Sequence, residues 1–259
     1  MKIATWNVNS VKARIGTVMD WLKEAAPDVA CLQEIKTTDE GFPRMELEDL
    51  GYNIETHGQK SYNGVAILSK FPMSDVTRGL PGGDGDDQAR YIETLIEADT
   101  PVRVASIYLP NGNPAPGPKY DYKLDWMDRL AAHARELLAL EERLVLAGDY
   151  NVIPTEDDVH DPAVWADDAL FLPTTRAKYH ALLNLGLTSA YEQADGRPHQ
   201  YTFWDYQGGA WPKNHGIRID HHLLSAEAAD ALSGITIHKD ARSMDKPSDH
   251  VPVVIELLD

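Results

Sequence analysis

The chain has 259 residues, of which 43% are hydrophobic, and a formal net charge of −17 at pH 7. This length and apolar fraction allow one large core, and no linker or repeat divides the sequence, so we expect a single domain over residues 1–259. The absence of a signal-peptide pattern and of a long apolar run predicts a cytoplasmic protein that does not enter a membrane. Cys31, the only cysteine, excludes an internal disulfide and a cysteine-based zinc site.

The first elements follow the order strand, helix, strand. Residues 2–8 form a predicted strand, and apolar residues recur at helical spacing over residues 11–26, with Ser10 as the expected N-cap. Pro27 ends this helix, and residues 28–32 form a buried strand that leads into Gln33 and Glu34. The pattern predicts a βαβ-like opening.

The middle and the end of the chain alternate between short strands and two longer helices. Short apolar runs without an intervening helix predict antiparallel strands between residues 51 and 108, and a mixed sheet. The expected strands are 52–56, 64–68, 73–80, 91–96, 102–108, 144–147, 216–224, 235–238 and 253–257, and the expected helices are 120–140 and 175–185. So many strands with so few helices predict an α/β fold with two packed mixed sheets and helices outside, a four-layer sandwich.

Residues 144–152 (LVLAGDYNV) are the stretch around which the rest is organised. The apolar run at 144–147 is typical of a buried strand, and Gly148 is expected to break it before a carboxylate. Because side chains at i and i+2 of an extended chain share a side, Asp149 and Asn151 can face one ligand.

Polar residues follow the other predicted strands in the same way. They are Asn7, Asn9, Gln33, Glu34, Tyr108, Asp149, Asn151, Asp220, Asp249 and His250. We expect them to converge on one face, where carboxylate and amide oxygens suit Mg²⁺ or Mn²⁺ better than zinc. Such a cation usually binds substrate phosphate, and a histidine oriented by a carboxylate can activate water, so the pattern favours phosphoester hydrolysis.

These residues lie in six ordered blocks that span nearly the whole chain. They are TWNVN at 5–9, LQEIK at 32–36, YLPNG at 108–112, GDYN at 148–151, RID at 218–220 and KPSDHVP at 246–252. With them the sequence resembles the endonuclease/exonuclease/phosphatase superfamily, and within it the exonuclease III branch of abasic-site endonucleases. The resemblance implies a DNase I-like fold and a Mg²⁺-dependent nuclease, with Mn²⁺ as a substitute. The implied activities are cleavage 5′ of abasic sites, 3′ to 5′ exonuclease and removal of 3′-phosphates.

The resemblance also implies residue roles. Glu34 would be the main metal ligand, with Asn7, Asn9 and Asp249 beside it. Asp149 and Asn151 would contact the attacking water and the scissile phosphate, Tyr108 and His250 would bind that phosphate, and Asp220 would accept the other N–H of His250. Either Asp149 or the Asp220–His250 pair can be the base; we favour Asp149, with His250 protonated. Asn9 stands where some relatives carry a carboxylate, which predicts a weaker metal site.

Substrate contacts are expected around Asp220 and in a basic cluster. In the branch that the sequence resembles, the region of Phe203, Trp211, Ile217 and Ile219 forms an apolar pocket for a flipped-out abasic sugar. Asn111 matches a phosphate contact, and Lys36, Arg90 and Arg218 are the expected basic contacts to DNA. Because residues 37–196 carry a net charge of −15, binding should depend on such local cations and on salt.

Duplex DNA with abasic sites or 3′-blocked ends is therefore the expected partner, bound by a monomer. Two alternatives stay open. One is a phosphodiesterase of the same fold that acts on RNA or another phosphoester, such as a phospholipid headgroup. The other is a non-catalytic nucleic-acid-binding module, although binding alone needs no cluster of carboxylates.

Overall fold

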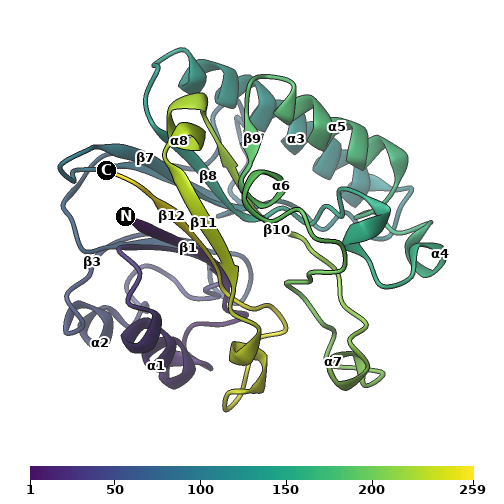
Figure 1. The fold of residues 1–259 in the computed structure, drawn as a ribbon, viewed down its shortest axis with the longest axis horizontal. Helices are drawn as coiled ribbons and strands as arrows, with labels where there is room; N and C mark the ends of the chain where they lie inside the picture. Colours follow the sequence, from purple (N-terminus) through teal and green to yellow (C-terminus); the bar gives the residue numbers. More distant parts are fainter.

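Two six-stranded β-sheets pack face to face, and helices cover the outer face of each sheet (Figure 1). This computed structural model describes residues 1–259. The prediction of a four-layer α/β sandwich with two mixed sheets is confirmed. No helix is both long enough and apolar enough to cross a membrane.

The first sheet has the strand order β11-β12-β1-β2-β4-β3. Its strands are β1 (Lys2–Asn7), β2 (Val29–Gln33), β3 (Asn53–His57), β4 (Val65–Ser69), β11 (Leu232–Ile237) and β12 (Val253–Leu257). β1 and β2 run parallel, and β12 lies antiparallel between β1 and β11. The parallel pair confirms the βαβ-like opening.

The second sheet has the strand order β5-β6-β7-β8-β10-β9. Its strands are β5 (Met73–Arg78), β6 (Tyr91–Ile96), β7 (Val102–Tyr108), β8 (Leu144–Asp149), β9 (Thr188–Ser189) and β10 (Asp220–Leu224). β7 and β8 are parallel, and a long helix connects them, so each sheet contains one βαβ unit.

The structure contains eight helices. They are α1 (Ile15–Ala25), α2 (Arg44–Glu48), α3 (Pro118–Leu138), α4 (Pro162–Trp165), α5 (Pro173–Leu183), α6 (Ala190–Ala194), α7 (Ala210–Lys213) and α8 (Ala226–Asp230), with 3₁₀ turns at Glu156–Asp158 and Lys239–Ser243. α1 and α2 lie against the first sheet, and α3 and α5 lie against the second (Figure 1).

β8 is buried on both faces, as its unbroken apolar sequence predicts. Val145 and Ala147 pack in the core between the sheets, whereas Leu144 and Leu146 pack under α3 and α5. Burial of each such side chain contributes about 1.5–3 kcal/mol. The strand is therefore held rigidly from both sides up to its polar end.

Gly148 ends the apolar run, as expected, but β8 continues through it to Asp149. A Cβ on Gly148 would lie 2.0 Å from the carbonyl oxygen of Ile107 on β7. The glycine is therefore required by the close approach of the two parallel strands, which places Asp149 directly beside the end of β7.

α1 begins at Ile15 rather than at the predicted Val11. The backbone N–H groups of Ser10 and Val11 donate to the carbonyl oxygens of Glu34 and Ile35, so they bond to the segment after β2 before the helix can start. Ser10 has a φ of 85° and does not cap α1. The turn at residues 9–14 thus supports the Glu34 segment.

A buried polar bridge joins the sheets just behind their polar ends. The Gln33 amide on β2 donates to Ser106 Oγ on β7 at 2.9 Å, and Thr5 Oγ1 on β1 donates to Gln33 Oε1 at 3.2 Å. Because buried hydrogen-bonded groups tolerate little displacement, this bridge fixes the relative position of the two sheets next to the site.

Candidate active site

Strand register brings the predicted polar residues to one rim of the sandwich. In the second sheet, Tyr108 lies opposite Asp149 on the neighbouring strand, and Asp149 lies opposite Asp220. In the first sheet, Asn7 lies opposite Gln33, and Glu34 follows directly. The two sets face each other across the gap between the sheets.

The rim contains a cavity of about 290 Å³. We call it the rim cavity; its walls are Glu34, Tyr108, Asn111, Asn113, Asp149, Asn151, Trp165, Asp168, Leu170, Phe203, Asp205, Ile217, Ile219, Asp249 and His250. Four of the six predicted strand ends contribute directly to it. From the other two, Asn7 bonds to Glu34 and Asp149, and Asp220 bonds to His250.

Asp149, Asp220 and His250 form a buried cluster at one side of the rim cavity. His250 Nδ1 lies 2.9 Å from Asp220 Oδ2, and His250 Nε2 lies 3.7 Å from Asp149 Oδ2. Asp149 also accepts hydrogen bonds from the Asn7 side chain at 2.9 Å and from the backbone N–H of Asn151 at 3.0 Å. The position of the Asp149 carboxylate is therefore fixed by Asn7 on β1, by the turn after β8 and by His250.

In this cluster, burial and the neighbouring charges act in opposite directions on the pKa values of Asp149 and His250. Burial raises the pKa of Asp149 to about 7, although the charge of His250 and the Asn7 hydrogen bond act against this. Burial alone would lower the pKa of His250, but the charges of Asp220 and Asp149 outweigh it and raise the pKa to about 10. His250 therefore carries a proton at neutral pH, while Asp149 can both bind and release one.

Glu34 is the centre of a second cluster in the same cavity. Its Oε1 accepts from Asn7 Nδ2 at 2.9 Å and from the Tyr108 hydroxyl at 2.8 Å, and its Oε2 lies 2.8 Å from the Lys36 ammonium. Burial disfavours the ionised carboxylate, but the hydrogen bonds from Asn7 and Lys36 outweigh it and lower the pKa of Glu34. Burial beside Glu34 raises the pKa of Tyr108, so its hydroxyl stays a donor.

The carboxylate and amide oxygens around Glu34 are ligands that suit a hard divalent cation. Asp249 is half-buried and lines the cavity, and its Oδ1 accepts from Asn9 Nδ2 at 3.3 Å. The Lys36 ammonium contacts both residues: it lies 2.6 Å from Asn9 Oδ1 and 2.8 Å from Glu34 Oε2. These oxygens therefore already surround a positive charge.

Asp149, Asp220 and His250 also bring possible ligand atoms within 4.8 Å of one another. In this second group, a protonated imidazole has no lone pair for a metal. The ionised Glu34 group therefore fits a cation better.

The far wall of the cavity is apolar, as predicted for Phe203, Ile217 and Ile219. The Phe203 ring meets the His250 ring edge-on, with centroids 5.0 Å apart. Trp165 and Leu170 complete this wall, and sequence reasoning missed both. The signal for Trp165 was weak: an aromatic residue within the polar stretch at 155–168.

One predicted DNA contact and one predicted pocket residue are corrected by the structure. Arg218 is 1% exposed, bonds to Asp158 and Glu192 at 2.7 and 3.0 Å, and stacks on Tyr191, so it cannot meet DNA at the surface. Trp211 does not line the cavity; its ring packs edge-on against Trp204 at 4.8 Å.

Lys36 and Arg90 lie beside residues that line the rim cavity. Lys36 bonds to Glu34, and the Arg90 guanidinium lies over the Tyr108 ring at 4.8 Å. Asn111 is exposed and donates to Asn151 Oδ1 at 3.3 Å.

Known proteins resemble this chain in both sequence and fold. Residues 4–250 match the Endonuclease/Exonuclease/phosphatase family. Exodeoxyribonuclease III of Haemophilus influenzae is 31% identical over 99% of both chains. The chain belongs to the endonuclease/exonuclease/phosphatase family. The predicted family and the prediction of a nuclease hydrolase are thereby confirmed.

Solved structures place this family member among DNA-processing enzymes. The 3′ phosphatase NExo from Neisseria, bound to a product DNA hairpin, superposes with a TM-score of 0.96, is 36% identical and covers 100% of both chains. An AP endonuclease from Archaeoglobus fulgidus superposes with a TM-score of 0.94, is 34% identical and covers 99% of both chains.

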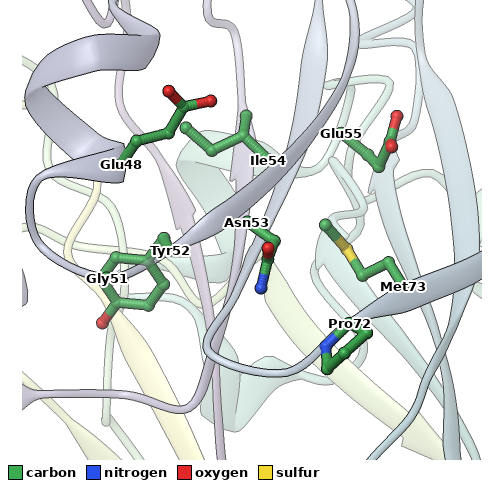
Figure 2. A pocket seen from close by; sticks show the side chains of 8 residues that line it. All are labelled: Glu48, Gly51, Tyr52, Asn53, Ile54, Glu55, Pro72 and Met73. Atoms are coloured by element: carbon green, nitrogen blue, oxygen red, sulfur yellow. The ribbon is translucent and has the colours of Figure 1, made fainter.

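A hollow larger than the rim cavity lies elsewhere (Figure 2). We call it the β3 hollow; it measures about 640 Å³ and is lined by Glu48, Gly51, Tyr52, Asn53, Ile54, Glu55, Pro72 and Met73. Figure 2 shows the carboxyl groups of Glu48 and Glu55 on different sides of it. No residue predicted for the site lies there.

Proposed function

We propose that this chain is a Mg²⁺-dependent DNA repair nuclease. It hydrolyses the phosphodiester 5′ of abasic sites, removes 3′-phosphates and other 3′-blocking groups, and degrades duplex DNA from 3′ ends. The observation that carries the proposal is one cavity in which Glu34, Asp149 and His250 face an apolar wall. A module that only binds nucleic acid has no need for this buried cluster of charges, which is costly to assemble.

In this proposal Asp149 accepts the proton of the attacking water. A pKa of about 7 suits a general base near neutral pH, and the bonds from Asn7 and Asn151 hold its carboxylate in one orientation. Asn151 would position the water or the phosphate. Protonated His250 would stabilise the charge that develops on the phosphate, the kind of preorganised effect that usually contributes most to rate.

The Asp220–His250 pair is the alternative base. A base must have a free lone pair, but the pKa of about 10 keeps His250 protonated and its Nδ1 is bonded to Asp220. Asp220 is then a partner that orients His250 and stabilises its charge. These observations favour Asp149.

Glu34, with Asn7, Asn9 and Asp249, would hold the cation, and Mn²⁺ should replace Mg²⁺. When bound, the cation would neutralise charge on a phosphate oxygen. Tyr108, whose hydroxyl donates to Glu34, is placed to bind the same phosphate. Asn9 adds no negative charge to this group, so we expect modest metal affinity.

The apolar wall supports a damaged-DNA substrate. Phe203, Ile217 and Ile219 would enclose a deoxyribose without a base, and an unpaired abasic nucleotide is the least costly to extrude. Two relatives support the same substrate class, because one is a 3′ phosphatase bound to DNA and the other an AP endonuclease.

Lys36, Arg90 and Asn111 would contact the DNA backbone. Because the chain carries a net charge of −17, these contacts should weaken steeply with salt. A monomer would suffice, since one chain supplies every residue of the cavity.

Cleavage of defined oligonucleotides tests the proposal. The substrates are a duplex with one stable abasic analogue, a duplex with a 3′-phosphate, undamaged duplex and RNA, each with Mg²⁺, Mn²⁺ or EDTA. We expect nicking 5′ of the lesion and release of phosphate, both abolished by EDTA. Turnover of RNA alone would favour the same-fold phosphodiesterase, and binding without cleavage would favour the non-catalytic module.

A further inference from the structure

A fully buried lysine lies directly behind the rim cavity. Lys123 belongs to α3, on the outside of the second sheet, and is 0% exposed. Its ammonium donates to the backbone carbonyl oxygens of Asn111 at 3.0 Å and of Asn151 at 2.5 Å. It thereby joins two loops that follow different strands and that both line the cavity.

The backbone around Lys123 is fitted to this side chain. Asn151 has a φ of 47° and Gly112 a φ of 88°, both in the left-handed region. A Cβ on Gly112 would lie 2.6 Å from Lys123 Cδ, so the first loop rests directly on the aliphatic part of the lysine. These turns direct the two carbonyl groups at the ammonium instead of at another strand.

Through these carbonyl groups, Lys123 connects to the reacting residues. The Asn151 backbone N–H donates to Asp149 Oδ1 at 3.0 Å, and the Asn111 side chain donates to Asn151 Oδ1 at 3.3 Å. The peptide groups on both sides of Asn151 are therefore fixed, one by Asp149 and one by Lys123.

Burial of an ammonium costs free energy unless its hydrogen bonds compensate for the lost hydration. Burial lowers the pKa of Lys123 to about 7, against the attraction of Asp149 and Asp168. An apolar side chain of similar size would avoid the desolvation but would leave two buried carbonyl groups without a donor. The lysine therefore holds the loops in a geometry that packing alone does not hold.

We propose that Lys123 is a positioning residue for phosphoester hydrolysis, which holds Asn151 and Asn111 at the distance from Asp149 that the reaction requires. It does not touch substrate, because the loops that it supports lie between it and the cavity. This inference rests on the proposed function and adds to it a residue outside the cavity.

The test is a double-mutant cycle on the full-length protein with the 3′-phosphate duplex and Mg²⁺. The variants are Lys123→Met, Asn151→Gly and their combination; glycine at 151 accepts the left-handed backbone. We expect Lys123→Met to lower kcat by about 10²-fold, as small misplacements of reacting groups do, and to change KM less than about threefold. In the Asn151→Gly background the same change should lower kcat less than it does in the wild type, because the Asn151 side chain, one of the groups that Lys123 positions, is gone.

A matched control removes a charge from the same helix. Lys119 is exposed on the first turn of α3, and Lys119→Met should leave kcat unchanged. Lys123→Gln, which keeps a donor without the charge, should recover part of the activity.

Three results would overturn the proposal. They are an unchanged kcat in Lys123→Met, an equal loss in both backgrounds, and failure of both Lys123 variants to fold, as judged by circular dichroism and thermal melting. The last would make Lys123 a residue of the fold alone. An inactive wild-type protein would instead contradict the proposed function.

Discussion

The β3 hollow and the rim cavity differ in size and in the side chains around them. The β3 hollow, about 640 Å³, is the larger, but its polar groups are mostly exposed and do not bond to one another across it. The rim cavity, about 290 Å³, is walled by Asp149 and His250, which are 1% and 4% exposed and bonded into one network. Volume therefore does not locate the chemistry of this fold; convergent buried charges do.

Substitution of Asp149 should have the largest effect, and it tests most directly whether the chemistry takes place in the rim cavity. Asp149→Asn keeps the shape of the side chain but cannot accept the proton, so we expect kcat to fall by at least about 10²–10³-fold. Asn151→Gly should lower kcat less, because Asn151 only positions. The measurement is single-turnover cleavage of the abasic duplex. A larger loss for Asn151→Gly would reverse the proposed division of roles.

Metal dependence should separate Glu34 from the rest of the cavity. Glu34→Gln removes the ionised carboxylate, so the Mg²⁺ concentration for half-maximal activity should rise by at least about tenfold, the scale of changes at metal sites. A Mg²⁺ titration of kcat for wild type and variant measures this. An unchanged midpoint would place the cation at Asp149, Asp220 and His250.

Phe203 should affect the choice of substrate more than the reaction itself. Phe203→Ala opens the apolar wall, and we expect abasic-site nicking to fall by about tenfold relative to 3′-phosphate release, as for loss of one apolar contact. The readout is the ratio of the two rates, because Phe203 also packs on His250 and both rates can fall. A constant ratio would show that the wall does not read the abasic sugar.

His133 provides a buried ion pair outside both hollows, 2.7 Å from Glu93. Burial disfavours its charge, but the hydrogen bond to Glu93 outweighs this and raises the pKa of His133 above its usual value. The stabilisation of the fold by this ion pair is thus complete below about pH 6.5, and it is lost as pH rises through the raised pKa of His133. The Tm difference between wild type and His133→Gln should shrink by about 2 °C from pH 6 to pH 9, with kcat unchanged. A constant difference would contradict this.

The β3 hollow should give the smallest effect. Glu48→Gln and Asn53→Ala alter its exposed wall, and kcat on every substrate should stay within about twofold of wild type. Measurement of both cleavage rates checks this. A loss similar to that of Phe203→Ala would mean that the larger hollow also serves the reaction.

Most strands could be predicted from the sequence because they are buried and therefore apolar. The ranges expected for β6, β7 and β12 agree with the structure, and the polar residues that follow the strands do meet. The helices α2, α4, α6, α7 and α8 have four or five residues, too few for a periodic pattern, and were not predicted.

The errors in the site arose from long-range contacts. Arg218 adjoins Asp220 and looked like a DNA contact, but Asp158 and Glu192, distant in sequence, bury it. Lys123 lies in an ordinary amphipathic helix pattern, and only the tertiary fold brings it to Asn151. Spacing along a chain does not encode such partners.

The position of β12 links completion of the first sheet to completion of the site. His250 directly precedes β12, and β12 completes the first sheet between β1 and β11. A nascent chain that extends only to β11 already contains Glu34 and Asp149, yet β1 has an open edge and the imidazole is absent. A chain without this segment therefore lacks both the second neighbour of β1 and the cation proposed to act on the phosphate. The first sheet and the site are completed by the same segment.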